Sequence, residues 1–167
     1  YVAAGQGTAT VELLEDVPDL DFILCPVGGG GLLCGTAMAA KSLRPGIRVI
    51  GVEPAAADDV AQSFRAGRRI SIPNPATIAD GLRTNMTGEM NFPIIQQYVD
   101  DVVTVTEDEI ISAMRELWEK LHLVVESSSA VAYAAVRSRK VPFAGKRVGI
   151  ILTGGNVDLA TLPWAKD

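Results

Sequence analysis

Four consecutive glycines, Gly28, Gly29, Gly30 and Gly31, follow the apolar segment 21–27. Glycine loses more conformational entropy on folding than any other residue, so a run of four needs a reason. Close approach of the backbone to a ligand is such a reason, because successive N–H groups at the start of a helix bind phosphate. A tight strand-to-helix turn alone needs one or two glycines. We therefore predict a phosphate-binding loop at this position.

A nucleotide-triphosphate loop of the Walker A type is the first candidate. Gly30 and Gly35 have the spacing that this motif requires. The motif also needs a lysine directly after its last glycine, to reach the terminal phosphates. Thr36 and Ala37 follow instead, so this type of site is excluded.

A dinucleotide-binding fingerprint is the second candidate. Gly29, Gly31 and Cys34 match G-x-G-x-x-G/A except for the cysteine at the third position. Glu53 ends the next apolar segment, where such folds carry an acid that binds a ribose hydroxyl. The local pattern leaves this interpretation open as an alternative.

Pyridoxal phosphate held by a glycine loop is the third candidate. It requires a hydroxyl or thiol against the pyridine nitrogen, supplied by the end of another strand. Thr153 has this place, because it follows the last apolar segment, 147–152.

Segments that alternate between strand and helix patterns must position these residues. Apolar runs predict strands, and apolar residues at helical spacing predict helices. The predicted strands are 21–27, 48–52, 101–105 and 147–152, and the predicted helices are 32–43, 58–66, 92–99, 107–121 and 129–140. Thr106 and Glu109 form a capping box at the start of the fourth helix, and His122 lies at its end. Continuous apolar strands between helices predict an α/β fold with a parallel sheet flanked by helices.

Composition excludes several classes of protein. The 167 residues carry a formal net charge of −5 and no basic block, so a nucleic-acid partner is not expected. No apolar run approaches the roughly 20 residues that cross a membrane. The two cysteines, Cys25 and Cys34, make neither a disulfide framework nor a zinc site. We expect a cytoplasmic protein of one domain.

Six short motifs resemble one enzyme family along the whole chain. They are GQGT at 5–8, PVGGGGL at 26–32, EP at 53–54 with DD at 58–59, TIADG at 77–81, VES at 125–127 and LTGGNVDL at 152–159. Together they resemble the fold-type-II pyridoxal-phosphate enzymes, specifically the serine/threonine dehydratase and serine racemase group. The resemblance implies a tryptophan-synthase-β-like fold, pyridoxal phosphate as cofactor, a β-hydroxy amino acid as substrate and a homodimer.

The resemblance also implies a role for individual residues around the cofactor. The four glycines at 28–31 would donate N–H groups to its phosphate, and Thr153 would hydrogen-bond its pyridine nitrogen. A neutral hydroxyl there does not enforce protonation of the ring, which suits β-elimination. Gly81 would lie beside the ring, with a simple turn glycine after Asp80 as the alternative.

Glu126 stands where the family carries a glutamate near the active site, and the resemblance makes it a candidate catalytic residue. Family members usually have proline next, whereas this chain has Ser127. The serines Ser127, Ser128 and Ser129 are alternatively candidates to cap the following helix.

Glu53, the carbonyl of Ala57 and Asp59 resemble the family's divalent-cation site. Two carboxylates and a backbone oxygen suit Mg²⁺ or another hard cation. As an alternative, Asp58 and Asp59 favour a helix N-terminus through the helix dipole.

The family's Schiff-base lysine, which lies in a Ser-x-Lys-x-Arg type motif, has no counterpart in this chain. The lysines are Lys41, Lys120, Lys140, Lys146 and Lys166, and none has that context. We therefore expect residues 1–167 to be the C-terminal, large cofactor-phosphate-binding domain of a longer enzyme, with Tyr1 near its middle. The missing N-terminal half would be its partner, and this chain alone would be inactive.

The expected activity of the whole enzyme is that of a pyridoxal-phosphate-dependent L-serine or L-threonine ammonia-lyase (dehydratase), which releases a 2-oxo acid and ammonia. A serine or hydroxyaspartate racemase/dehydratase is one alternative. A stand-alone phosphate- or dinucleotide-binding module without catalysis is the other.

Overall fold

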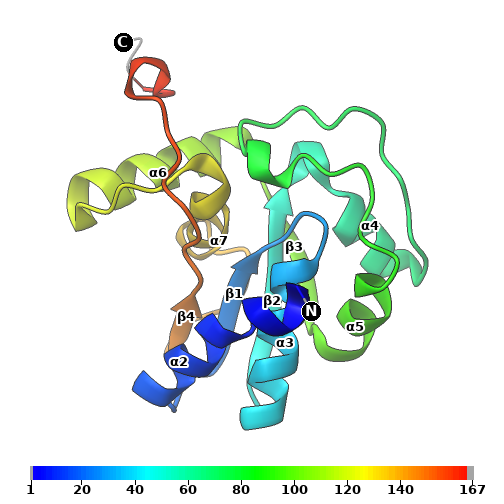
Figure 1. Ribbon diagram of the computed structural model, residues 1–167. Coiled ribbons are helices and arrows are strands. Elements are labelled where there is room, and N and C mark those ends of the chain that lie inside the picture. The colour runs from blue at the N-terminus through cyan, green and yellow to red at the C-terminus, as the bar shows by residue number, and fades with distance from the viewer. Residues whose placement is uncertain (1, 165–167) are drawn as a thin grey trace.

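Within residues 2–164, which the computed structural model describes, four parallel strands form one sheet (Figure 1). Two residues discussed above, Tyr1 and Lys166, lie outside the described residues. The strands are β1 (Phe22–Pro26), β2 (Arg48–Pro54), β3 (Asp101–Val105) and β4 (Val148–Ile150). Their order across the sheet is β3-β2-β1-β4. The α/β class and the parallel sheet predicted from the apolar segments are confirmed.

Alternating side chains of β1 face opposite sides of the sheet, and every residue of β1 is buried. Ile23 and Cys25 enter one hydrophobic cluster, whereas Phe22 and Leu24 enter another. The first cluster takes its remaining members largely from helices α2 to α5, and the second takes them largely from α6 and α7. Helices therefore cover both faces, which explains why the strands are continuously apolar.

Seven α-helices lie in the described part of the chain. They are α1 (Val2–Gln6), α2 (Thr8–Asp16), α3 (Gly31–Leu43), α4 (Asp59–Ala66), α5 (Asn91–Tyr98), α6 (Glu107–Leu121) and α7 (Ser127–Arg137). Short 3-10 turns are η1 (Ala55–Ala57), η2 (Asp80–Leu82) and η3 (Leu159–Thr161). None of the helices between residues 2 and 164 is both long and apolar enough to cross a membrane.

Helix α6 begins and ends as the sequence predicts. The Thr106 hydroxyl accepts a hydrogen bond from the Glu109 N–H, and the Glu109 carboxylate accepts one from the Thr106 N–H. His122 ends the helix in a left-handed conformation, with φ of 55°. Ile110, Ala113, Met114 and Leu117 are buried on the inner face, whereas Leu121, the last residue of the helix, is 57% exposed.

Helix α7 and strand β4 depart from the predicted bounds. The helix begins at Ser127, two residues earlier than predicted, and its N-cap residue is Glu126. The alternative that a serine caps this helix is therefore wrong, because the serine hydroxyls bind other segments. Strand β4 ends at Ile150, two residues early. The Ile151 N–H still donates to the Leu24 carbonyl of β1 at 2.9 Å, and beyond it the Thr153 N–H donates to the Ser129 hydroxyl of α7.

Candidate cofactor-binding site

A pocket of about 310 Å³ lies where β1 and β4 end and α3 and α7 begin. Its lining includes every residue that the sequence assigned to the cofactor or to catalysis. These are the glycine loop (residues 28–31), Gly81, Glu126 and Thr153. Four segments far apart in the sequence thus meet at the carboxyl ends of the strands, which is where open parallel sheets bind ligands.

The glycine loop presents backbone N–H groups to this pocket. Gly30 is the N-cap of α3 and has a φ of 94°. Residues with a Cβ atom rarely adopt this left-handed conformation. The first intrahelical bond runs from the Cys34 N–H to the Gly30 carbonyl at 2.9 Å. The N–H groups before Cys34 therefore have no acceptor within the helix, and the first turn carries no acidic residue. This arrangement favours an anion.

The segment before α5 supports the loop from behind. The Gly29 carbonyl accepts hydrogen bonds from the Gly88 N–H at 3.0 Å and from the Asn91 side-chain amide at 2.7 Å. A Cβ atom at Gly30 would lie 3.1 Å from atoms of Asn91, Ile95 and Thr87. These neighbours fix the loop, and they leave room only for glycine at residue 30.

Gly81 lies in η2 and faces the start of α7. Its N–H donates to the Ser128 hydroxyl at 3.0 Å and also to the Asp80 carboxylate at 3.0 Å. A Cβ atom at Gly81 would lie 3.0 Å from the Ser128 Oγ. Close approach to α7, rather than a left-handed turn, is therefore the reason for glycine here.

Glu126 is held in the pocket by the segment that follows β4. Its N–H donates to the Gly154 carbonyl at 2.9 Å, and its Oε2 accepts from the Asn156 N–H at 3.0 Å. These bonds define its position although serine, not proline, follows it. Glu126 also lines a second cavity of about 500 Å³, so its carboxylate lies between two solvent-accessible spaces.

The sequence did not identify Ser128 and Ser129 as residues that shape the site. Ser128 lines the pocket, and the Ser129 hydroxyl accepts the Thr153 N–H at 2.8 Å. The signal that could have found them is the run of three serines at the start of a helix that needs at most one cap.

Glu53 and Asp59 form a buried acidic pair away from this pocket. Glu53 ends β2 and accepts hydrogen bonds from the N–H groups of Val60 at 3.3 Å and Ala61 at 2.6 Å. Burial, opposed by these bonds and reinforced by the charge of Asp59, raises the pKa of Glu53 to about 9. Glu53 does not reach the pocket, so it is not placed to bind the ribose of a dinucleotide at the glycine loop.

Asp59 has a buried carboxylate without a hydrogen-bond partner. Both of its oxygens are inaccessible to solvent, and burial raises its pKa to about 6. The hydroxyls of Thr84 and Thr87 are also buried without a partner. The Asp59 N–H, the Thr84 hydroxyl and the Thr87 N–H approach the carboxylate without reaching normal hydrogen-bond geometry, and they lower its pKa in part. Ala57, with 1% of its surface exposed, completes the predicted set.

Among residues 2–164 no three His, Cys, Asp or Glu side chains are grouped so that they could hold a metal ion. The set predicted from the sequence contains only two such side chains, because its third ligand is the backbone carbonyl of Ala57.

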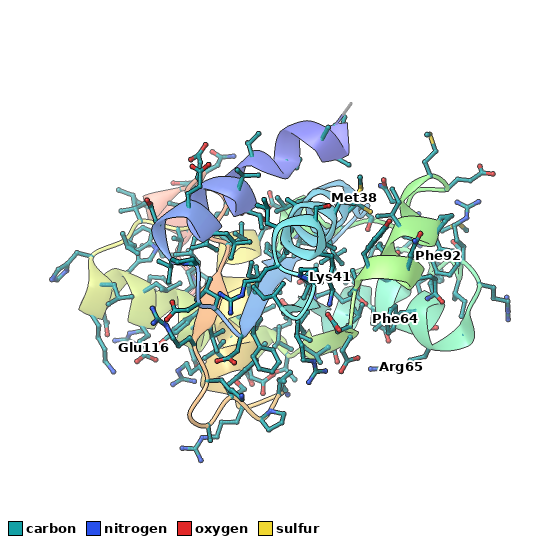
Figure 2. All side chains as sticks on the ribbon, turned by 90° about the horizontal axis from the view of Figure 1, so that it is seen from below. Met38, Lys41, Phe64, Arg65, Phe92 and Glu116 are labelled. Atoms are coloured by element: carbon teal, nitrogen blue, oxygen red, sulfur yellow. The ribbon has the colours of Figure 1, made fainter. Side chains whose placement is uncertain are left out.

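Each lysine in the described part of the chain forms an ion pair, and none lines the pocket. Lys41, in the last turn of α3 (Figure 2), contacts Asp100 at 2.7 Å. The other pairs are Lys120–Glu116, Lys140–Glu109 and Lys146–Asp21.

The two thiols are buried and unreactive. Burial raises the pKa of Cys25 to about 12 and that of Cys34 to about 11, so neither is a thiolate near neutral pH. Both are free cysteines that serve as small buried side chains.

Comparisons with known proteins agree with this geometry. A family model described as "Pyridoxal-phosphate dependent enzyme" matches residues 1–154. The chain is 49% identical to the L-threo-3-hydroxyaspartate ammonia-lyase of Saccharomyces cerevisiae, over 99% of the chain and 52% of that protein. It is 49% identical to the serine racemase of Arabidopsis thaliana, over 96% of the chain and 50% of that protein.

A solved structure, that of maize serine racemase, superposes with a TM-score of 0.89 at 45% identity, covering 95% of this chain and 49% of that one. The chain spans about half the length of the curated relatives it matches. The family match extends over most of the chain, including the glycine loop and Thr153. The chain therefore belongs to the family of pyridoxal-phosphate dependent enzymes.

Proposed function

We propose that this chain is the cofactor-phosphate-binding, C-terminal domain of a pyridoxal-phosphate-dependent ammonia-lyase that acts on a β-hydroxy amino acid. The observation that carries the proposal is the meeting of the glycine loop, Gly81, Glu126 and Thr153 in one pocket. The names of the relatives, a hydroxyaspartate ammonia-lyase and a serine racemase, support this substrate class. The whole enzyme would release a 2-oxo acid and ammonia.

The chemistry of the pocket lining suits pyridoxal phosphate. The free N–H groups at the start of α3 would bind the phosphate, and no acidic residue in that turn opposes them. Thr153 would donate its hydroxyl to the pyridine nitrogen. When bound, this cofactor withdraws electrons from the α-carbon of an amino acid and so weakens its C–H bond. A neutral hydroxyl at the ring nitrogen keeps that withdrawal moderate, which favours loss of a β-substituent.

Glu126 would handle a proton in this pocket. Its Oε2 is occupied by the Asn156 N–H. Its Oε1 would take up or release a proton on a ligand group beside the glycine loop. A carboxylate with one oxygen held by a backbone N–H and the other available to a ligand has the geometry of a general acid–base group.

Glu53, the Ala57 carbonyl and Asp59 would hold a divalent cation such as Mg²⁺. The support is the pair of unpartnered Asp59 oxygens, buried beside a second carboxylate. Two buried carboxylates without a counter-charge are costly, and a hard cation with oxygen ligands would offset that cost. The cation would stabilise the fold or activate the enzyme, since these residues do not line the pocket.

The activity is tested on the full-length protein that contains this chain. Purified protein with pyridoxal phosphate is incubated with L-threo-3-hydroxyaspartate, L-serine or L-threonine, and 2-oxo acid and ammonia are measured. We expect equal amounts of both products from at least one substrate. The same protein depleted of the cofactor is the control. Absence of both products with all three substrates would refute the proposed lyase.

Serine or hydroxyaspartate racemisation is the second candidate, because a serine racemase shares 49% of the chain's aligned residues. Chiral chromatography of the same serine reactions separates the two activities. A D-serine yield that exceeds the 2-oxo acid would make racemisation the main reaction. The homodimer and the cytoplasmic location stay predictions, which light scattering and cell fractionation test.

A further inference from the structure

Three successive serines open α7, and each hydroxyl binds a different segment of the chain. The Ser127 hydroxyl donates to the Ile78 carbonyl at 2.8 Å. The Ser128 hydroxyl accepts from the Gly81 N–H, and the Ser129 hydroxyl accepts from the Thr153 N–H. The N-cap residue is Glu126, and each of these three hydroxyl bonds runs to a segment outside α7. The hydroxyls therefore connect this helix to its surroundings.

The partners of Ser128 and Ser129 are the two residues placed at the cofactor ring. Gly81 lies in η2 and Thr153 follows β4, so 71 residues separate them in the sequence. Neighbouring residues of a helix point about 100° apart. Two adjacent serines can therefore reach two separate sides of one pocket, and the first turn of α7 contacts both Gly81 and Thr153.

The hydrogen bonds of Ser128 and Ser129 differ in whether another acceptor is present for the same N–H. Ser129 is fully buried, and its hydroxyl is the acceptor found for the Thr153 N–H. Ser128 is 3% exposed, and the Gly81 N–H that it accepts is shared with the Asp80 carboxylate. Loss of the Ser129 hydroxyl should therefore displace its partner more than loss of the Ser128 hydroxyl.

Helix α7 is also docked by apolar contacts. Besides Ser128 and Ser129, five residues of the helix are buried, and most of them pack into the cluster formed by β1, β2 and α6. Alanine also has a higher helix propensity than serine. A serine that served the fold alone could thus be replaced by alanine with little consequence for the pocket.

We propose that Ser128 and Ser129 are positioning residues for the cofactor: they hold Gly81 and Thr153 at the separation that the pyridine ring requires, and Ser129 aligns Thr153 with the ring nitrogen. Ser127 assists by tying Ile78, three residues before Gly81, to the same helical turn. This inference rests on the proposed binding of pyridoxal phosphate in the pocket. It assigns the run of serines a role that capping does not explain.

The test compares Ser128→Ala and Ser129→Ala in the full-length protein with Thr106→Ala as the matched control. Thr106 also supplies a hydroxyl that accepts a backbone N–H at the start of a helix, α6, but it does not line the pocket. For each variant the dissociation constant of pyridoxal phosphate, the absorption spectrum of the bound cofactor and the melting temperature are measured.

We expect Ser129→Ala to weaken cofactor binding about tenfold, which corresponds to about 1.4 kcal/mol, and to shift the absorption maximum of the bound cofactor. Ser128→Ala should have the same effects to a smaller degree, about threefold in affinity, because Asp80 still accepts the Gly81 N–H. Thr106→Ala should lower the melting temperature and change neither the affinity nor the spectrum.

Two other outcomes are distinguishable. If both serine variants bind the cofactor as the unmodified protein does and with the same spectrum, the positioning role is refuted while the proposed function stands. If the unmodified protein itself does not bind pyridoxal phosphate, the proposed function falls and this inference falls with it.

Discussion

The carboxylate of Glu126 accepts a hydrogen bond of 3.0 Å from the backbone N–H of Asn156, 30 residues further along the chain. Asn156 belongs to the segment that begins with Thr153, so the candidate acid–base group and the candidate ring partner are held by one short stretch of backbone. A shift of that stretch would move both groups together.

Glu126→Gln separates the position of this side chain from its proton chemistry. The amide oxygen of glutamine can still accept the Asn156 N–H, but the side chain no longer exchanges a proton. We expect the turnover number of the full-length enzyme to fall at least about 100-fold, with cofactor affinity within about twofold. Steady-state kinetics and cofactor titration measure the two quantities. Turnover close to that of the unmodified enzyme would contradict an acid–base role.

Thr153→Val removes the hydroxyl proposed to meet the pyridine nitrogen and keeps the shape of the side chain. We expect cofactor binding to weaken about fivefold, the effect of one hydrogen bond worth about 1 kcal/mol. Thr153→Ser is the control, because it retains the hydroxyl and should bind almost normally. Fluorescence titration with pyridoxal phosphate gives both constants. Equal affinity of the two variants would place the ring nitrogen elsewhere.

Gly30→Ala should disrupt the glycine loop through both backbone strain and contact. The residue has φ of 94°, and an added Cβ would lie 3.1 Å from three neighbouring atoms. We expect a stability loss of about 1–3 kcal/mol and a clear loss of cofactor affinity. Gly67→Ala is the matched control, since Gly67 has φ of 64° but no atom within 4 Å of the added Cβ.

The Gly67 variant should lose stability and keep its cofactor affinity. Urea unfolding and cofactor titration of both variants make the comparison. If Gly30→Ala binds the cofactor as tightly as Gly67→Ala does, the loop does not bind the phosphate.

The acidic pair gives the cation-free protein a defined pH dependence. Burial raises the pKa of Glu53 from 4.5 to about 9 and that of Asp59 from 3.8 to about 6. Between the ordinary pKa and the raised pKa of each group, the folded state binds more protons than the unfolded state. The stability that this contributes is complete below the ordinary pKa values and is lost as the pH rises through the raised ones. With a chelator present, we expect the melting temperature to fall from pH 5 to pH 9.

Added Mg²⁺ should raise the melting temperature most at high pH, where both carboxylates are ionised. Glu53→Gln should be more stable than the unmodified protein in chelator at pH 8, because it removes one of the two buried carboxyl groups and leaves Asp59 without the neighbouring Glu53 charge. The same variant should not respond to Mg²⁺. A melting temperature of the unmodified protein that is independent of Mg²⁺ across this range would exclude the proposed cation site.

Borohydride reduction of the cofactor-loaded full-length enzyme should label one lysine outside this chain. Lys41, Lys120, Lys140 and Lys146 are each ion-paired and do not line the pocket. Peptide mass spectrometry locates the modified residue. Specific labelling of one of these four would show that the reactive amine lies in this half.

Much of the fold follows from local sequence, because the apolar strands and the Thr106 capping box carry their information in a few adjacent residues. The glycine loop is equally local, since its need for glycine at residue 30 appears as a run of glycines. The bounds of α7 are different. A serine at a helix start favours capping, but here Ile78, Gly81 and Thr153 compete for the hydroxyls, and these partners are distant in sequence.

The residues of the proposed cation site illustrate a second limit of prediction from sequence. Spacing places Glu53 and Asp59 near each other around η1, but it does not reveal that both oxygens of Asp59 are buried without a partner. The sequence spacing also does not show whether Glu53 faces a ribose at the glycine loop or is buried within the fold. That distinction depends on the N–H groups of Val60 and Ala61, to which the carboxylate turns.

The pairing of β1 with β4 determines when the pocket can exist. The Arg147 N–H donates to the Asp21 carboxylate across 126 positions of sequence, at the edge where the two strands meet. Contacts of such separation form late, because a long loop must close first. During synthesis the glycine loop would emerge before Thr153, which reaches it only after β4 has docked. Cofactor capture would then report that this half of the protein has finished folding.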